Sequence, residues 1–318
     1  MTEIFNGALV AAKAEVVNVA SVPQRSPFRY PGGKTWLIPR FRKWLAGLPE
    51  KPALLIEPFA GGGIITLTAV MENLVERALM VELDENVAAV WQVILSPDYR
   101  ELIRRILNFE MTRERVIAEL AEPPKNAIDH AFKTILRNRV QRGGIMAPGA
   151  SLVKNGENGK GIGSRWYPNT LAERIKAIAQ VRNRIEFRHE NAVNIIPFHL
   201  AQHHAAWFID PPYTAGGKSA GSRLYLHKEL DHESLFSLMG RAQGCVMMTY
   251  DDAAEVRHLA ARHGFGIEEV PMSNTHHEVI YELVLTKNAN IQPPSQNKPP
   301  RKKIHRQSRF PKLVLAGA

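Results

Sequence analysis

Two apolar segments separated by a glycine-rich turn constrain the fold of this chain more than any other feature. Residues 53–57 (ALLIE) predict a short strand, residues 59–63 (FAGGG) a turn, and the apolar residues 64–74 are compatible with a helix. A second apolar run follows at residues 78–82 (ALMVE), after which Asp84 can cap another helix. Strands that alternate with helices at this spacing predict a parallel sheet.

The same pattern returns in the second half of the chain. Strands are predicted at residues 184–187, 205–210 and 245–250, and residues 267–270 and 279–285 are expected to form a closing antiparallel pair. These segments predict an α/β fold with a mostly parallel, doubly wound sheet and helices on both faces. In such a fold, the turns that bind ligands lie at the carboxyl edge of the sheet.

Residues 96–182 interrupt this alternation, and we interpret them as an inserted, largely helical region. A helix is predicted near residues 131–142, and residues 143–163 form a loop that is too polar and too rich in glycine to build a core. The predicted organisation is therefore a flexible leader, a main domain in two pieces, the insert and a disordered basic tail. The leader is residues 1–23, and the main domain is residues 24–95 and 183–286. The insert is residues 96–182, and the tail is residues 287–318.

The positive charge of the chain is concentrated in the tail. The formal net charge is +10, and residues 287–318 contain eight Lys and Arg residues and no Asp or Glu, which leaves 10 − 8 = +2 for the rest. The Pro, Gln and Asn content of the tail predicts disorder. A basic tail favours a polyanion such as nucleic acid as a partner, and a solvated terminus is the alternative.

Composition excludes several classes of protein. The single cysteine allows no intrachain disulfide, which favours a reducing, intracellular setting. No run of 18 or more apolar residues suggests a membrane span, and no signal peptide is apparent. The twelve histidines form no H-E-x-x-H motif or similar ligand set, so we expect no metal. We expect a cytoplasmic protein encoded by a bacterium or a phage.

The most specific local motif is the tetrapeptide Asp210-Pro211-Pro212-Tyr213, which directly follows the apolar residues 206–209. The Asp210 carboxylate and the Pro211 carbonyl can accept the two hydrogens of an amino group, which localises the nitrogen lone pair and makes the amine a better nucleophile. The prolines hold the loop rigid. Tyr213 supplies a ring that can stack on a base taken out of a helix. By itself, the motif could also be a simple turn.

Three further motifs fit a ligand site beside this loop. The glycines of residues 59–63 let the backbone approach a ligand closely, with a spacing unlike that of dinucleotide or phosphate loops. Glu82, about 20 residues later at a strand end, can accept hydrogen bonds from ribose hydroxyls. Residues 27–34 (PFRYPGGK) offer a tight turn, the ring of Tyr30 and the ammonium of Lys34, which can reach a carboxylate. Each motif alone could be an ordinary turn or strand end.

In combination, these motifs resemble the Dam-like adenine-N6 DNA methyltransferases. The order FRYPGGK, EPFAGGG, acidic strand end, long insert and DPPY is typical of that family, and the resemblance spans roughly residues 26–285. It implies a fold of the S-adenosylmethionine-dependent methyltransferase type. It also implies site-specific methyl transfer from S-adenosylmethionine to N6 of an adenine flipped out of DNA, by positioning and electrostatics.

The resemblance assigns roles to particular residues. The catalytic residues are Asp210, Pro211, Pro212 and Tyr213. The residues that contact S-adenosylmethionine are Tyr30, Lys34, Glu57, Phe59, Ala60, Gly61, Gly63, Glu82, Asn191 and Asp210. Two positions depart from the family pattern. Glu82 stands where Asp is usual, and Asn191, next to Glu190, stands where a further acid is expected; the amide oxygen of Asn191 could still accept a hydrogen bond from the adenosine amino group.

The insert matches the target-recognition region of the family. It carries Arg and Asn side chains able to bind base edges or phosphates, and we expect DNA contacts from Arg137, Asn138, Arg139, Arg142 and Arg165. Some of these arginines could instead form surface ion pairs or contact only phosphates.

Alternative functions remain open at this point. The enzyme could act on N4 of cytosine or on RNA, although the initial Asp of the tetrapeptide favours adenine by resemblance, because cytosine-N4 enzymes usually begin it with Ser. The chain could also be a DNA-binding relative without catalysis, which the intact residues 210–213 and Lys34 argue against.

Overall fold

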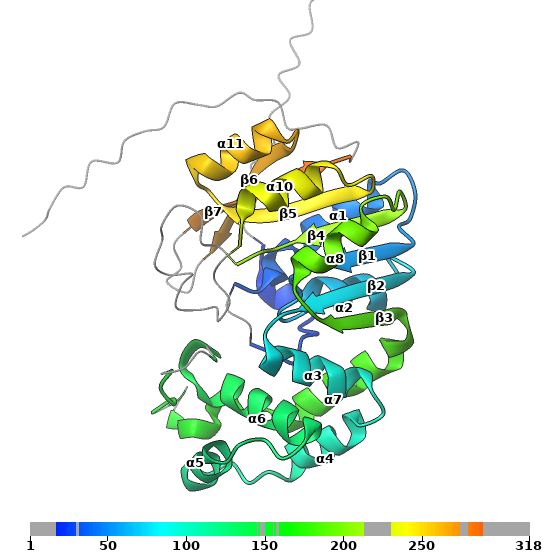
Figure 1. Cartoon of the computed structure of the whole chain (residues 1–318). Helices are drawn as coiled ribbons and strands as arrows, with labels where there is room; N and C mark the ends of the chain where they lie inside the picture. Colours follow the sequence, from blue (N-terminus) through cyan, green and yellow to red (C-terminus); the bar gives the residue numbers. More distant parts are fainter. Residues whose placement is uncertain are drawn as a thin grey trace, which may run out of the picture. The chain divides into compact units, whose positions relative to one another are not determined.

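A seven-stranded sheet in the order β3-β2-β1-β4-β5-β7-β6 organises the part of the chain that the computed structural model describes (Figure 1). That part comprises residues 17–29, 32–144, 146, 150–154, 156, 159–212, 230–273 and 279–288, all within the unit Lys13–Pro293. The strands are β1 (Leu54–Glu57), β2 (Arg77–Glu82), β3 (Ile185–His189), β4 (Ala205–Ile209), β5 (Cys245–Asp251), β6 (Gly266–Ser273) and β7 (Val279–Lys287).

Strands β1 to β5 are parallel, and β7 runs antiparallel to both of its neighbours, β5 and β6. All seven predicted strands are present, so the predicted α/β fold with a mostly parallel, doubly wound sheet is confirmed. The chain runs outward from β1 through β2 to β3 and then returns to β4 on the other side of β1. The strand order therefore reverses between β1 and β4, which is where open α/β sheets bind ligands.

Helices cover both faces of the sheet. They are α1 (Ile38–Ala46), α2 (Ile64–Met71), α3 (Glu85–Leu95), α4 (Tyr99–Asn108), α5 (Arg113–Ala121), α6 (Ala127–Val140), α7 (Pro168–Val181), α8 (Ala192–His199), α10 (His232–Gly240) and α11 (Ala254–Arg262). Short 3₁₀ turns are η1 (Val19–Ser21), η2 (Lys34–Leu37), η3 (Arg142–Gly144), η5 (Gly161–Arg165) and η6 (Arg182–Arg184).

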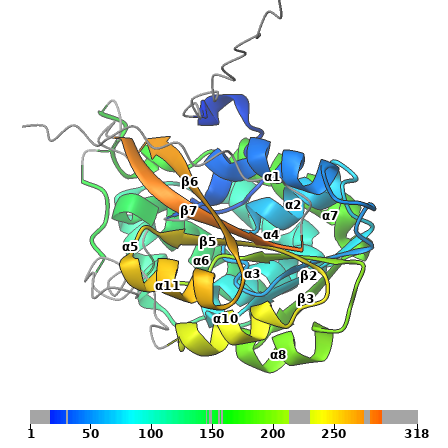
Figure 2. The same cartoon turned by 90° about the horizontal axis from the view of Figure 1, so that it is seen from above.

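The period-two alternation of strand side chains divides the apolar residues into two cores. Leu55 and Phe208 point into one core, together with residues of α1, α2 and α3. Their neighbours in the same strands, Ile56 and Trp207, point to the opposite face of the sheet. They lie in a second core with residues of α8, α10 and α11. Figure 2 shows these three helices together on one side of the sheet.

The helices of the insert, α4 to α7, share a core with the sheet. Leu102, Phe132 and Ile175 are buried in the same apolar cluster as Trp91 of α3 and Leu55 of β1. Figure 1 shows α4 to α7 grouped beyond the β3 edge of the sheet, next to α3. The insert therefore depends on the main body for burial, and its assignment as a separate target-recognition domain stays a prediction.

The structure differs from the predicted bounds of the leader and of the tail. Val22, expected in the flexible leader, is buried in the core. Lys287, expected to start the tail, pairs with Val246 as the last residue of β7, and the Asn288 side chain donates hydrogen bonds to Ala242 O and Gly244 O. The remaining leader and tail residues lie outside the described part. Within that part, no helix has the length and apolar character needed to cross a membrane.

Helix α3 provides a test of the local structure that supports the site. Asp84 accepts hydrogen bonds from Asn86 N (2.8 Å) and Val87 N (3.3 Å), so it caps α3 as predicted. We expect Asp84→Ala to lower the free energy of unfolding by about 1 kcal/mol, because those donors lose their acceptor. Asp98 precedes α4 without such a bond and provides the matched control. If Asp84→Ala and Asp98→Ala lower the free energy of unfolding equally, as measured by thermal or urea unfolding, the stabilising role of the Asp84 cap is contradicted.

Candidate active site

The polar residues at the carboxyl ends of β1, β2 and β4 come together because these strands are neighbours in the sheet. β1 ends at Glu57, β2 ends at Glu82, and Asp210 directly follows β4. Since all three strands are parallel, their last residues lie at one edge. The sequence thus located the motifs at the point where the strand order reverses.

Glu57 is buried beneath the glycine-rich turn. Its Oε2 accepts hydrogen bonds from Thr66 N (3.0 Å) and Thr66 Oγ1 (2.5 Å), which tie β1 to α2. Burial raises the pKa of Glu57 to about 8, against the lowering effect of the Thr66 bonds, and the charges of Asp210 and Glu82 raise it further. Glu57 is therefore mostly protonated at neutral pH.

Glu82 holds the glycine-rich turn in place, a role that the sequence did not reveal. Its Oε2 accepts a hydrogen bond from Gly61 N (2.8 Å), and its Oε1 accepts from Leu83 N (2.8 Å) and Asp84 N (2.9 Å). Burial raises the pKa of this carboxyl. A carboxylate offers about four acceptor sites, so three backbone bonds leave room for a ribose hydroxyl. The proposed ribose contact and the support of the turn can coexist.

The turn itself requires glycine at its last position. Gly63 has φ +63°, and a Cβ there would lie 2.7 Å from Trp91 Cζ2 and 2.8 Å from Met80 Cε. Ala60 N donates to Val81 O at 3.0 Å, which draws the turn over β2. Phe59 is half-buried against the second core. The turn is thus shaped by packing, and its contacts with the cofactor stay a prediction.

Lys34 and Asp210 form the central ion pair of the site. Lys34 is buried at the start of η2, and its Nζ lies 2.9 Å from Asp210 Oδ1 and 3.7 Å from Glu282 Oε2. Nζ also donates to Gly32 O at 3.1 Å. Thr249 Oγ1 of β5 donates to Asp210 Oδ1 at 2.8 Å. Lys34 thus pairs with a carboxylate of the chain itself, and its contact with S-adenosylmethionine stays a prediction. Asp210 is fixed through Oδ1 by two elements.

Sequence reasoning missed Thr249 and Glu282. Both are single polar residues inside apolar strand segments, where a buried hydrogen-bonding group needs a partner. That isolation is the signal that could have identified them. Of the other catalytic candidates, Pro211 is buried and Pro212 is half-buried. Tyr30 and Tyr213 lie outside the described residues.

Asn191 follows β3, beside the carboxyl end of β2. It is exposed, and its side chain accepts a hydrogen bond from Val193 N at 3.1 Å, so it caps α8. The neighbouring Glu190 donates its backbone N–H to Glu82 O at 3.1 Å. The cap explains why Asn occupies this position, and a contact between Asn191 and the cofactor stays a prediction.

Two of the predicted DNA-binding residues are interior residues, and the structure corrects their assignment. Asn138 accepts from Arg29 N (2.8 Å) and donates to Arg29 O (2.9 Å) and Gly144 O (3.0 Å). Arg139 Nη2 donates to Pro27 O at 2.5 Å, and burial lowers the pKa of its guanidinium to about 10. These side chains face inward because they lie on the inner side of α6, where they bind the backbone that leads to Lys34.

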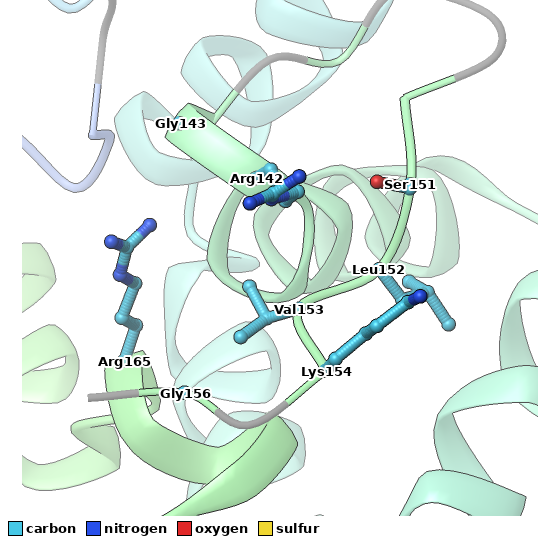
Figure 3. A pocket seen from close by; sticks show the side chains of 8 residues that line it. All are labelled: Arg142, Gly143, Ser151, Leu152, Val153, Lys154, Gly156 and Arg165. Atoms are coloured by element: carbon cyan, nitrogen blue, oxygen red, sulfur yellow. The ribbon is translucent and has the colours of Figure 1, made fainter. Parts of the chain in front are cut away.

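Other basic residues of the insert line an open pocket of about 500 Å³ (Figure 3). Arg142 comes from η3, Arg165 from η5, and Lys154 from the segment between them. Of the eight described residues that line the pocket, three are basic and none is acidic. Arg142 and Arg165 are among the residues predicted to contact DNA, and Lys154 lines the same pocket without having been predicted. The half-buried Arg137 precedes the two interior residues on α6.

Residues 30–272 match the model of the D12 class N6 adenine-specific DNA methyltransferase family. Similar solved structures include the rRNA methyltransferase aviRa from Streptomyces viridochromogenes, at 14% identity and a TM-score of 0.40, covering 86% of this chain and 93% of that chain. An rRNA methylase from Streptococcus thermophilus has 10% identity and a TM-score of 0.34, with 79% and 95% covered. No curated protein matches the chain.

The corrected assignment of Asn138 can be tested by stability. We expect Asn138→Ala to lower the free energy of unfolding by about 2–4 kcal/mol, because three hydrogen bonds disappear and their buried partners are left unsatisfied. The neighbouring Arg137→Ala is the control and should change stability by less than about 0.5 kcal/mol. Urea unfolding measures both. A fully stable Asn138→Ala protein with weakened DNA binding would restore the original assignment.

Proposed function

The chain belongs to the D12 class N6 adenine-specific DNA methyltransferase family, and on that premise we propose that it methylates N6 of adenine at a particular DNA sequence. Its methyl donor is S-adenosylmethionine. The observation that carries the proposal is the position of Asp210. It follows β4 where the strand order reverses, and Lys34 and Thr249 hold its carboxylate.

The residues of the site fit a cationic cofactor. Glu57, Glu82 and Asp210 lie close enough that the charges of Asp210 and Glu82 raise the pKa of Glu57. A positively charged ligand would relieve this repulsion. Besides Asp210, the proposed cofactor contacts are Tyr30, Lys34, Glu57, Phe59, Ala60, Gly61, Gly63, Glu82 and Asn191. When bound, S-adenosylmethionine supplies an electrophilic methyl group on a positively charged sulfur.

The catalytic role proposed for Asp210 is that of a hydrogen-bond acceptor. Its carboxylate accepts one hydrogen of the adenine amino group, and the Pro211 carbonyl accepts the other, so the lone pair of N6 becomes available to the methyl carbon. The bonds from Lys34 and Thr249 fix the carboxylate beforehand. Such pre-positioned charge accounts for much of enzyme catalysis because it needs no reorganisation during the reaction. The proton lost from N6 leaves to water or to a nearby carboxylate.

DNA binding is proposed for the insert and the tail. The pocket lined by Arg142, Lys154 and Arg165 presents positive charge suited to phosphates or base edges. Arg137 remains a candidate beside it. Tyr213 is proposed to stack on the flipped base, as the motif predicted.

Substitution of Asp210 tests the proposed chemistry. We expect Asp210→Ala to slow methyl transfer by about 100- to 1,000-fold, because a charge that acts in the transition state is removed. Incorporation of labelled methyl groups into unmethylated DNA of mixed sequence measures the rate, and base analysis identifies the product. The exposed Asp98→Ala is the control and should retain full activity. Near-normal transfer by Asp210→Ala would contradict the role. N4-methylcytosine as the product, or transfer to RNA offered in place of DNA, would contradict the substrate.

Truncation after Asn288 tests the tail. It removes residues 289–318 and 8 − 1 = 7 of the basic residues of the expected tail, while keeping Lys287 in β7. We expect weaker DNA binding at low salt. The slope of log affinity against log salt concentration should become shallower by about 0.9 for each phosphate that the shortened protein no longer neutralises. The methylated sequence should stay the same, because recognition is assigned to the insert. An unchanged slope would show that the tail does not bind DNA, and a changed sequence would place recognition in the tail.

A further inference from the structure

A buried carboxylate that the proposed chemistry does not use lies against Lys34. Glu282 of β7 is only 6% exposed, and its Oε2 is 3.7 Å from Lys34 Nζ. Within the described structure, this oxygen is buried without a hydrogen-bond partner. A buried carboxyl oxygen in that state is costly, so a hydrophobic residue would serve the sheet better. The placement of Glu282 therefore indicates a functional role that acts through its contact with Lys34.

We infer that Glu282 is a positioning residue for methyl transfer, which acts by sharing the Lys34 ammonium with Asp210. This inference rests on the proposed function. Lysine presents a compact charge, so one ammonium between two carboxylates divides its attraction between them. When Glu282 is ionised, Lys34 is held by both acids and Asp210 is a stronger acceptor for the adenine amino group. When Glu282 is neutral, Lys34 pairs with Asp210 alone and weakens it as an acceptor.

The geometry agrees with this division. Nζ of Lys34 lies 2.9 Å from Asp210 and 3.7 Å from Glu282, so Asp210 is the nearer partner and Glu282 is within electrostatic reach. Lys34 is 3% exposed, so water screens neither interaction strongly. A change in the charge of Glu282 must therefore be felt by the Lys34–Asp210 pair.

Among the described residues of the sheet, the charged neighbours of Glu282 are Asp251 and Glu268. Asp251 lies directly opposite on β5, and Val270 lies opposite on β6. Glu268 follows on the same face of β6 and is paired with Arg40 of α1 at 3.0 Å. Among the described residues outside the sheet, Lys34 and Asp210 are the charged groups that act on Glu282. The ionisation of Glu282 therefore depends on Lys34, Asp210 and Asp251. Glu268 is a neighbouring carboxylate that pairs with Arg40 instead.

The ionisation of Glu282 falls within the working range of an enzyme. Burial raises the pKa of Glu282 to about 7, Lys34 lowers it, and Asp210 and Asp251 raise it. Because the pKa is raised, Glu282 is neutral below about pH 6 and ionised above about pH 8. If the ionised form favours transfer, the rate must rise with pH through this interval.

The test compares Glu282→Gln with the parent protein. Glutamine keeps the shape but stays neutral, so it resembles the protonated parent. We expect single-turnover transfer to unmethylated DNA of mixed sequence, with saturating S-adenosylmethionine, to be similar for both proteins at about pH 6. At about pH 8.5 the parent should be about tenfold faster, less than the 100-fold typical of a direct contact. Glu57, with a pKa of about 8, titrates in both proteins and cancels in the ratio of the two rates.

Two further variants separate positioning from folding. Glu268→Gln removes the neighbouring carboxylate that pairs with Arg40, and it should keep the pH profile of the parent. Glu282→Asp keeps a titrating carboxyl and should keep a rise of rate with pH, even if Glu282→Gln does not fold. A rate ratio of one at every pH, a constant lower rate for Glu282→Gln, or a flat profile for Glu282→Asp would overturn the inference. A parent that forms no N6-methyladenine at any pH would instead overturn the proposed function.

Discussion

The buried ion pair between Lys34 and Asp210 is the interaction on which the arrangement of the site depends. Lys34 comes from the segment before β1, and Asp210 follows β4. Thr249 extends the connection to β5, and Glu282 extends it to β7. Removal of one partner from such a pair leaves an uncompensated buried charge, which typically costs about 3–5 kcal/mol. Lys34 and Thr249 thus hold Asp210 relative to the segment before β1, to β5 and to β7.

The segment that carries Lys34 is held in turn by the insert. Asn138 and Arg139 of α6 bind the backbone of Arg29 and Pro27, and Arg174 of α7 donates to Ser26 O at 3.0 Å. The proposed DNA-recognition region and the ion pair of the site therefore meet along one stretch of backbone. The position of this stretch depends on side chains of the insert, and the two regions also share one apolar core.

Local patterns predicted the strands and the Asp84 cap of α3, because each depends on short-range periodicity or on chain order. The predictions failed where partners are distant in sequence. An Arg-Asn-Arg run on a helix does not reveal which side faces inward, so Asn138 and Arg139 were assigned to DNA. The pairing of Lys287 with Val246 extends β7 into the expected tail, and such pairing depends on the sheet rather than on composition.

Burial at this edge of the sheet has two opposing effects on the same acids. It disfavours ionisation, so the pKa of Glu57 rises to about 8 and that of Glu282 to about 7. It also strengthens any ion pair that does form, since water no longer screens it. Asp210, nearest to Lys34 and bonded to Thr249, receives the compensating charge first. Glu57 and Glu282 are left with pKa values near neutral pH, where a nearby positive charge has its greatest effect on their ionisation.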